Sequence, residues 1–389
     1  MKKIILAYGI LFGAPVLIAQ NLPTPDHIII VMLENKGYSN IIGNPQSPYL
    51  NSLAVDSNCA VFSESFGVTH PSQPNYVALF SGSNQGITND NVPSGTPFST
   101  CNLGYSLISN GYTFKGYSEE LPSTGSLVFT SGKYVKRHCP WAFWQGTGTN
   151  QLAPETHHPF TDFPSNYDSL PTVSFIIPSL IHDMHDPIYS ASTAISNGDD
   201  WLSTNIDGLV QWVKTNNSLL IIQYDEDEGV EIGGIVIGGN NNRIPTMFIG
   251  PMVNGGTYST HINHYNVLRT LEDIYSLPYC DSSAFYQPID DCWKLIAGIT
   301  DTKVNKQISV YPVPASRQLN VYVSSEQEDN VVISITNVLG SRLYDQTASI
   351  HSGPNSLIID TEKFVTGTYF ISIRSRNINV VKKIVLENR

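Results

Sequence analysis

The sequence predicts an α/β protein with a mostly parallel sheet covered by helices on both faces, followed by a small all-β sandwich. Short β-branched apolar runs alternate with amphipathic stretches over most of the chain, which is typical of buried parallel strands and covering helices. From about residue 300 the pattern changes to short alternating runs separated by turn residues. The excess of acidic over basic residues lies before residue 308, so the two parts also differ in charge.

Buried strands are predicted where short apolar runs lack polar interruption. The first spans residues 26–33, and similar runs follow at 172–177 and 218–224. Shorter runs at 235–237 and 246–249 are expected to add further strands.

Two helices are predicted between and after these strands. Residues 201–214 place four apolar side chains on one stripe, and Asp199 and Asp200 are expected to cap the start of this helix. Residues 265–275 show the same periodicity. Strands that alternate with such helices predict a sheet covered on both faces.

The beginning of the chain and its charge indicate where the protein goes. Residues 1–19 are expected to form a secretory signal, because two lysines precede an apolar run that is too short for the ~20 residues of a membrane span. No other run is long and apolar enough, so we expect an exported protein with no transmembrane segment in the mature chain. The net charge of −12 and the lack of a basic run argue against nucleic-acid binding.

Export would allow disulfide bonds between some of the five cysteines. Cys280 and Cys292 bracket a short turn-rich loop and are the preferred pair, with Cys59 and Cys101 as a further candidate pair. No Cys-x-x-Cys motif is present, so neither a zinc knuckle nor a redox motif is indicated.

The C-terminal residues 308–389 predict an antiparallel sandwich, joined by a polar linker at 301–307 to a catalytic domain at 20–300. The predicted strands are four to seven residues long and lie at 318–323, 331–336, 356–359, 368–373 and 380–386. A carbohydrate-binding or adhesive sandwich would show a similar pattern.

This segment resembles the C-terminal sorting domain of the type IX secretion system of the Bacteroidota. The matching motifs are Val310-Tyr311-Pro312-Val313-Pro314-Ala315, Asn337-Val338-Leu339-Gly340, Gly367-Thr368-Tyr369 and Lys382-Lys383. The resemblance implies that type IX secretion machinery carries the protein through the periplasm of a Gram-negative bacterium to the cell surface or the medium.

Polar clusters follow three of the predicted strands. Glu34-Asn35 ends the first strand, residues 182–186 follow the second, and residues 225–228 end the third. Ligand sites in α/β sheets lie beyond the carboxyl ends of the strands, so these side chains are expected to meet. An oxygen-rich set with clustered like charges points to a divalent cation.

Ser72 is the candidate nucleophile. Residues 76–80 are predicted to be helical, with Pro74 near the first position, so Ser72 would lie just ahead of a helix N-terminus that favours an anion such as phosphate. A simple N-cap serine would look the same.

Six ordered motifs resemble the phosphoesterase family of bacterial acid phosphatases and phosphatidylcholine-type phospholipases C, within the alkaline-phosphatase-like superfamily. They are Val31-Met32-Leu33-Glu34-Asn35, Thr69-His70-Pro71-Ser72-Gln73-Pro74-Asn75-Tyr76, Gly116-Tyr117-Ser118-Glu119-Glu120-Leu121-Pro122, Lys136-Arg137-His138-Cys139-Pro140, Asp183-Met184-His185-Asp186 and Asp225-Glu226-Asp227.

The resemblance implies roles for eight of these residues. The expected metal ligands are Glu34, Asn35, Ser72, Asp225 and Glu226. Ser72 is also the implied nucleophile, and Asn75 is expected to hold a phosphate oxygen. His138 and His185 are expected around the phosphate, with His185 as the acid that protonates the leaving group. The resemblance implies one or more divalent metal ions, with Ca, Mg, Mn and Zn as the candidates.

These roles imply a secreted phosphomonoesterase of acid phosphatase type that acts on small phosphate esters through a phosphoserine intermediate. A phospholipase C that acts on phosphatidylcholine-like lipids is the alternative within the family. A surface binding protein with a structural metal site is the alternative from another class.

Overall fold

The computed structural model describes residues 22–185, 190–232, 235–237, 239, 241–294, 308–325, 327–337, 341–375 and 379–387. The chain divides into two compact units, residues 1–294 and 295–389. The expected signal at 1–19 and linker at 301–307 lie outside the described residues. Within the described part, no helix combines the length and apolarity that a bilayer span requires.

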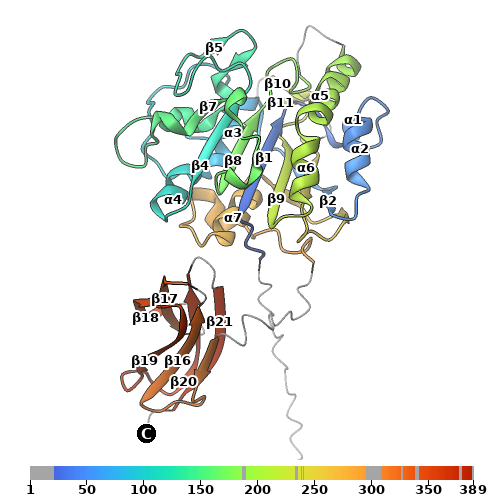
Figure 1. Ribbon diagram of the computed structural model, residues 1–389. Coiled ribbons are helices and arrows are strands. Elements are labelled where there is room, and N and C mark those ends of the chain that lie inside the picture. The colour runs from blue at the N-terminus through green and yellow to red at the C-terminus, as the bar shows by residue number, and fades with distance from the viewer. Residues whose placement is uncertain are drawn as a thin grey trace, which may run out of the picture. The chain divides into compact units, whose positions relative to one another are not determined.

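The first unit is built on an eight-stranded sheet with the order β13-β2-β12-β9-β1-β8-β4-β7 (Figure 1). Its strands are β1 (His27–Leu33), β2 (Cys59–Phe62), β4 (Phe114–Ser118), β7 (His157–Pro159), β8 (Val173–Ile177), β9 (Ser218–Tyr224), β12 (Thr246–Ile249) and β13 (Gly256–Tyr258). The run from β9 through β1, β8 and β4 to β7 is parallel, whereas β12 is antiparallel to both of its neighbours. The mostly parallel sheet is therefore confirmed, and sequence reasoning missed the strands β2, β4, β7 and β13.

The side chains of β1 show why the sheet is covered on both sides. Alternate residues of a strand point to opposite faces. Ile28, Ile30 and Met32 belong to one apolar cluster, and Ile29, Val31 and Leu33 belong to the other.

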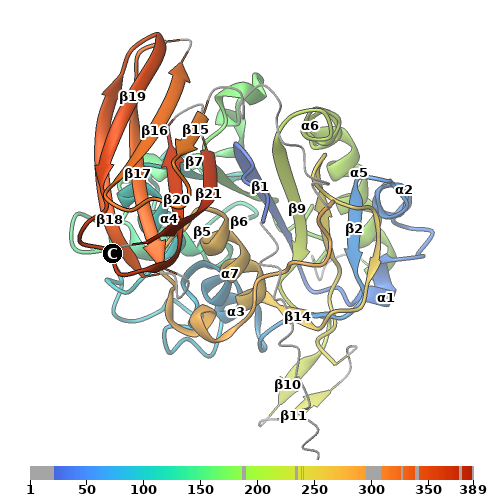
Figure 2. The same cartoon turned by 90° about the horizontal axis from the view of Figure 1, so that it is seen from below.

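Each cluster is completed by its own helices, which flank the sheet in Figures 1 and 2. The first includes residues of α3 (Ser72–Ser81), α4 (Leu103–Ser109) and α7 (His264–Ile274). The second includes residues of α1 (Tyr38–Ile41), α2 (Pro48–Ala54), α5 (Ala191–Asn205) and α6 (Asp207–Val213).

The helix predicted at 201–214 differs from the structure in its start and its continuity. Helix α5 begins ten residues earlier, with Ser190 as its N-cap, and a separate α6 follows after Ile206. Asp199 therefore does not cap this helix. Its carboxylate instead accepts the N–H groups of Tyr49 at 2.8 Å and Leu50 at 2.9 Å, so it caps the start of α2.

A smaller β-hairpin stands apart from the large sheet. β10 (Val230–Ile232) and β11 (Ile235–Ile237) pair only with each other, so the predicted strand at 235–237 exists but lies outside the main sheet. Two further two-stranded sheets pair β3 (Ser65–Phe66) with β14 (Ile262–Asn263) and β5 (Thr130–Ser131) with β6 (Tyr134–Val135).

The disulfide of the structure joins Cys101 and Cys280, whose Cα atoms are 5.4 Å apart. Both expected pairs are therefore wrong. Cys59 belongs to the apolar cluster on the opposite face of the sheet from Cys280, so it cannot reach Cys101. Cys292 is buried as a free thiol. The sequence separation of 179 between the bonded cysteines explains why local spacing could not reveal the pair.

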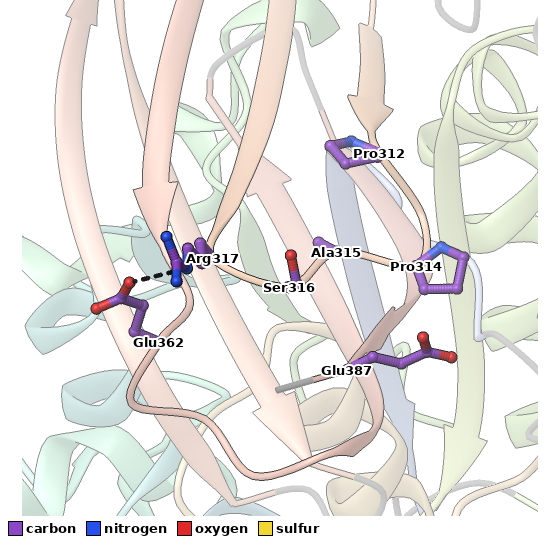
Figure 3. Close-up of a pocket in the computed structure, with 7 residues that line it drawn as sticks. All are labelled: Pro312, Pro314, Ala315, Ser316, Arg317, Glu362 and Glu387. Atoms are coloured by element: carbon purple, nitrogen blue, oxygen red, sulfur yellow. Dashed lines mark ion pairs between the residues drawn. The ribbon is translucent and has the colours of Figure 1, made fainter. Parts of the chain in front are cut away.

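The second unit is an antiparallel sandwich. One sheet has β15 (Ile308–Tyr311), β16 (Gln318–Ser325) and β19 (Gly353–Asp360), and the other has β17 (Asp329–Asn337), β18 (Arg342–Ile350), β20 (Gly367–Arg374) and β21 (Asn379–Leu386). All five predicted strands are present, and β15 and β18 are additional. A shallow pocket on this unit is lined by Pro312, Pro314, Ala315, Ser316, Arg317, Glu362 and Glu387 (Figure 3). Its charged residues Arg317 and Glu362 pair with each other at 3.6 Å.

Candidate active site

Three neighbouring parallel strands carry polar side chains to one edge of the large sheet. Glu34 follows β1, Asp183 lies beyond β8, and Asp225 follows β9, with β1 between the other two strands. Backbone hydrogen bonds connect the strand ends, from Glu34 N to Asp183 O at 2.8 Å and from Asp225 N to Leu33 O at 3.1 Å. The three polar clusters thus meet beyond the carboxyl ends of the strands, as the sequence predicts.

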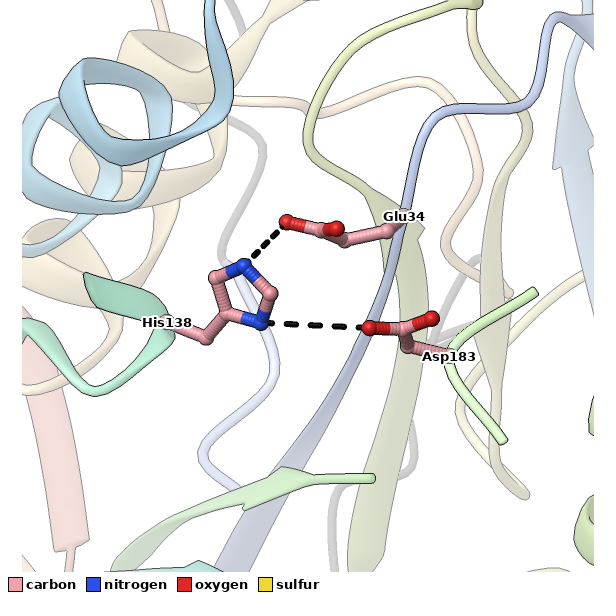
Figure 4. Close-up of side chains that lie close together, drawn as sticks. All are labelled: Glu34, His138 and Asp183. Atoms are coloured by element: carbon pink, nitrogen blue, oxygen red, sulfur yellow. Dashed lines mark ion pairs between the residues drawn. The ribbon is translucent and has the colours of Figure 1, made fainter. Parts of the chain in front are cut away.

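A buried carboxylate–imidazole group forms one part of the site (Figure 4). The Nε2 atom of His138 lies 2.5 Å from Glu34 Oε1, and its Nδ1 atom lies 3.9 Å from Asp183 Oδ2. One potential ligand atom from each of the three residues lies within 4.8 Å of the others, and all three side chains are buried. Two carboxylates and an imidazole are a suitable ligand set for a divalent transition metal or zinc.

His138 reaches this group from the 3₁₀ turn η1 (Lys136–His138). Its ring stacks on Tyr76 with a centroid distance of 4.9 Å and an interplanar angle of 7°. The fully buried ring of His138 lies between two carboxylates, where it is a candidate metal ligand. The role beside the phosphate that the sequence predicts for His138 stays a prediction.

Ser72 lies in a second polar group next to the first. Its hydroxyl donates to Glu226 Oε1 at 2.8 Å. The side-chain amide of Asn35 lies 3.2 Å from Ser72 Oγ and 3.1 Å from His185 Nδ1. The Asn35 backbone N–H donates to Asp225 Oδ1 at 3.0 Å. The predicted ligands Glu34, Asn35, Ser72, Asp225 and Glu226 are thus brought together.

Helix α3 begins at Ser72 itself, not after it, and Pro74 occupies its third position. One of the free N–H groups in the first turn of this helix is already used, because Gln73 N donates to Asp90 Oδ1 at 2.9 Å. The anion-binding capacity expected at the helix N-terminus is therefore partly consumed by a carboxylate of the protein.

Asn75 has different partners from the expected phosphate oxygen. Its side-chain oxygen accepts the N–H groups of Val68 at 2.9 Å and Thr69 at 3.0 Å. Its side-chain nitrogen donates to Thr69 O at 2.8 Å and Pro71 O at 3.2 Å. With both hydrogens and both lone pairs used, this buried amide holds the loop before Ser72 and has no donor left for a ligand.

Burial and mutual repulsion control the carboxyl groups of the site. Burial, and after it the negative charge of Glu34, raises the pKa of Asp183 and of Asp225 well above the usual range. Burial also raises the pKa of Glu226 to about 9. Burial opposes ionisation of Glu34 too, but His138 and His185 outweigh it and hold the pKa of Glu34 well below its usual value.

A further observation shows that these residues fit a bound cation. The buried oxygens Asp183 Oδ2 and Asp225 Oδ2 have no hydrogen-bond partner among the residues that the structure describes. Buried carboxylates that repel one another and lack donors are stabilised when a divalent cation joins them.

His185 occupies the outer side of the site. Its Nδ1 lies 3.2 Å from Glu34 Oε2, yet the side chain is 41% exposed, so its ring can meet a ligand from solvent. This position contrasts with the complete burial of His138.

Sequence reasoning left two buried members of the site without a role. Asp183 belongs to the motif Asp183-Met184-His185-Asp186, but the sequence alone does not identify it as a ligand. His70 lies two residues before Ser72, and its Nδ1 is 2.5 Å from Glu226 Oε2 while its Nε2 is 3.5 Å from Asp227 Oδ1. The position of His70, only two residues before Ser72, is the sequence feature that could have indicated that it belongs to the site.

The phosphoesterase family matches residues 44–278. The chain belongs to the phosphoesterase family. It is therefore a hydrolase of phosphoric esters. A secretion system C-terminal sorting domain of the type IX kind matches residues 309–387, which identifies the sandwich and indicates export to the surface or the medium.

Two curated relatives show what kinds of phosphatase resemble this member of the family. The phosphatidylinositol-3-phosphatase of Mycobacterium tuberculosis is 43% identical over 277 residues, covering 71% of this chain and 86% of that protein. An acid phosphatase of Aspergillus fumigatus is 26% identical over 262 residues, covering 64% of this chain and 54% of that protein. The phosphoesterase described here thus spans about half the length of this fungal relative.

Among solved structures, a protein in the alkaline phosphatase superfamily from Vibrio parahaemolyticus aligns with a TM-score of 0.49 and 11% sequence identity. The alignment covers 96% of this chain and 87% of that one.

Proposed function

We propose that the chain is an exported, metal-dependent phosphomonoesterase of acid phosphatase type that works through a phosphoserine intermediate. The observation that carries the proposal is the position of Ser72. Its hydroxyl is held by Glu226 and Asn35 beside a buried cluster of carboxylates and an imidazole. The sorting domain supports the further proposal that the type IX system exports this enzyme through the periplasm of a Gram-negative bacterium.

The buried cluster is the place for the metal. Glu34, His138 and Asp183 would hold one divalent ion, and Asn35, Ser72, Asp225 and Glu226 would complete this or a neighbouring position. Such an ion supplies positive charge that lowers the pKa of the serine hydroxyl and attracts phosphate oxygens.

The residues of the chain then divide the reaction between them. Ser72 Oγ passes its proton to Glu226, which accepts its hydrogen bond, and attacks phosphorus as the bond from phosphorus to the ester oxygen breaks. His185, exposed on the outer side of the site, donates a proton to the departing alcohol. Water hydrolyses the phosphoserine and releases inorganic phosphate, while His70 and Asn75 hold Glu226 and the loop before Ser72 in place.

A substrate panel tests this proposal directly. The purified protein is assayed with p-nitrophenyl phosphate, bis(p-nitrophenyl) phosphate and phosphatidylcholine, before and after chelation and metal replacement. We expect monoester hydrolysis that chelation abolishes and a divalent metal restores, together with phosphoserine at residue 72 in acid-quenched samples. Dominant phosphatidylcholine cleavage would favour a phospholipase C, and metal binding without turnover would favour a surface binding protein.

A monoester on a lipid headgroup is a second candidate substrate. It is favoured by the 43% identity to a phosphatidylinositol-3-phosphatase. The same chemistry serves a soluble and a lipid-borne monoester, so the two differ only in access. Release of inorganic phosphate from vesicles with phosphatidylinositol 3-phosphate, compared with a soluble inositol phosphate, distinguishes them.

A further inference from the structure

Arg137 is a charged residue next to the site that the proposed mechanism does not use. It lies in the 3₁₀ turn η1 and directly precedes His138, whose ring is part of the buried cluster. Arg137 is partly exposed, but its Nε atom is buried and has no hydrogen-bond partner among the described residues. A buried guanidinium N–H without an acceptor costs free energy that a bound anion would recover.

The other two arginines of the catalytic unit each form an ion pair with a carboxylate. Arg243 pairs with Glu64 at 3.5 Å, donates to Ser63 O and stacks on Tyr38. Arg269 pairs with Asp273 at 2.9 Å and stacks on Tyr279. In the described parts of the chain, no carboxylate forms an ion pair with Arg137, although acidic side chains outnumber basic ones.

The positive charge of Arg137 nevertheless acts on the site. Burial is the main reason why the pKa of His138 lies below its usual value, and Arg137 lowers it further. Arg137 likewise opposes the rise in pKa that burial and Glu34 cause in Asp183. The guanidinium is thus close enough to be felt at the cluster but is not bound to its carboxylates.

We propose that Arg137 binds the phosphate group of the substrate, with two guanidinium N–H groups donating to two of its terminal oxygens. A planar guanidinium matches phosphate in this bidentate manner. A monoester has three terminal oxygens and a charge near −2 at neutral pH, so two oxygens remain for Arg137 when the third faces the cluster. A diester has only two such oxygens and one charge. Arg137 is therefore a specificity residue for monoesters, an inference that rests on the proposed function.

Binding of inorganic phosphate tests the inference without turnover. The metal-loaded full chain is titrated with inorganic phosphate by calorimetry, for the wild type, Arg137→Gln and Arg137→Lys. We expect phosphate affinity to fall about 10- to 100-fold in Arg137→Gln, the usual range for a lost charge-assisted hydrogen bond, and by less in Arg137→Lys. Arg269→Lys is the matched control, because its arginine is already paired, and it should bind phosphate as the wild type does.

Ester specificity provides the second readout. In Arg137→Gln, kcat/KM for p-nitrophenyl phosphate should fall about 10- to 100-fold, whereas that for bis(p-nitrophenyl) phosphate should change less than about threefold. Metal content and melting temperature should match the wild type. Wild-type phosphate affinity in both Arg137 variants would overturn the inference, as would equal losses on both esters.

These outcomes differ from a failure of the proposed function. If Ser72→Ala retains turnover, the nucleophile assignment fails whatever Arg137 does. If Ser72→Ala is inactive and the Arg137 variants bind phosphate normally, only the inference about Arg137 fails. Should Arg137→Gln not fold, Arg137→Lys keeps the charge and the bulk, and its phosphate affinity decides.

Discussion

The sheet edge of the catalytic unit and the core of the sorting domain treat polar side chains in opposite ways. At the sheet edge, carboxylates, imidazoles and an amide are buried together, several of them with raised pKa values. In the sorting domain, Ser334 and Thr361 are the only polar side chains that are buried among the described residues, and its core is made of aliphatic and aromatic groups.

This difference reflects the different tasks of the catalytic unit and the sorting domain. Burying charged groups costs free energy, which is recovered where the groups hold a ligand or accept hydrogen bonds within the fold, as Asp199 does. The described core of the sandwich contains no buried charged side chain, so this core contributes to stability through apolar packing. The experiments below test whether the buried polar groups of the catalytic unit serve the reaction and whether the sorting domain is dispensable for it.

Ser72→Ala should have the largest effect on turnover. Removal of the attacking oxygen is expected to lower kcat by on the order of 10³-fold or more. The fold should persist, because the lost hydroxyl makes few contacts besides those with Glu226 and Asn35. Steady-state kinetics and a melting curve check both statements, and near-normal activity would remove Ser72 from the nucleophile role.

Asp225→Asn should show that the buried carboxylate lowers the stability of the metal-free protein but is needed for metal binding and activity. Because burial, Glu34 and Glu226 raise the pKa of Asp225, the neutral amide should raise the melting temperature of the chelated protein. The same change should lower metal content and reduce kcat/KM by roughly 100-fold, since a charged ligand is lost. Elemental analysis, calorimetry and kinetics measure the three effects. Full metal occupancy with full activity would contradict the ligand set.

His185→Ala should affect substrates according to their leaving groups. An alkyl alcohol needs a proton on departure, so alkyl phosphates should lose about 10²-fold in kcat. p-Nitrophenolate needs little protonation, and its ester should lose less than about tenfold. Equal losses on both esters would show that His185 does not act as the acid.

The stability of the chelated protein should fall as pH rises from about 4.5 to about 9. Glu226 has a folded pKa of about 9, far above that of an unfolded glutamic acid, so the unfolded state binds fewer protons than the folded state in this window. The slope of the free energy of unfolding with pH is therefore negative. A divalent metal should remove most of this slope, because it binds the ionised carboxylates. A chelated protein whose melting temperature rises over the window would contradict this account.

Deletion of residues 308–389 should have the smallest effect on turnover. The proposed site residues all belong to the first unit, so kcat/KM should stay within about twofold of the full chain. Export should fail, with the truncated protein retained in the periplasm of the host. Normal appearance of the truncated chain at the surface or in the medium would show that the sorting domain is not required.

Local sequence was sufficient to predict the structural features that depend on residues close together in the chain. The strands around β1, β8 and β9 follow from short β-branched runs, and the meeting of Glu34, Asp183 and Asp225 follows from their places at the ends of parallel strands. Helix α7 and the five predicted strands of the sandwich follow from periodicity in the same way. These features depend on contacts within a few residues or on one sheet edge, so a pattern along the chain contains them.

Tertiary structure alone decided the features that join distant segments. The Cys101–Cys280 bond, the use of Asp199 as a cap for α2 and the position of His138 between Glu34 and Asp183 each connect residues far apart in the chain. The full hydrogen bonding of Asn75 was also invisible, because its motif indicates an amide but not which atoms satisfy it. A side chain's role depends on which donors and acceptors remain after packing, and only the packed molecule settles that.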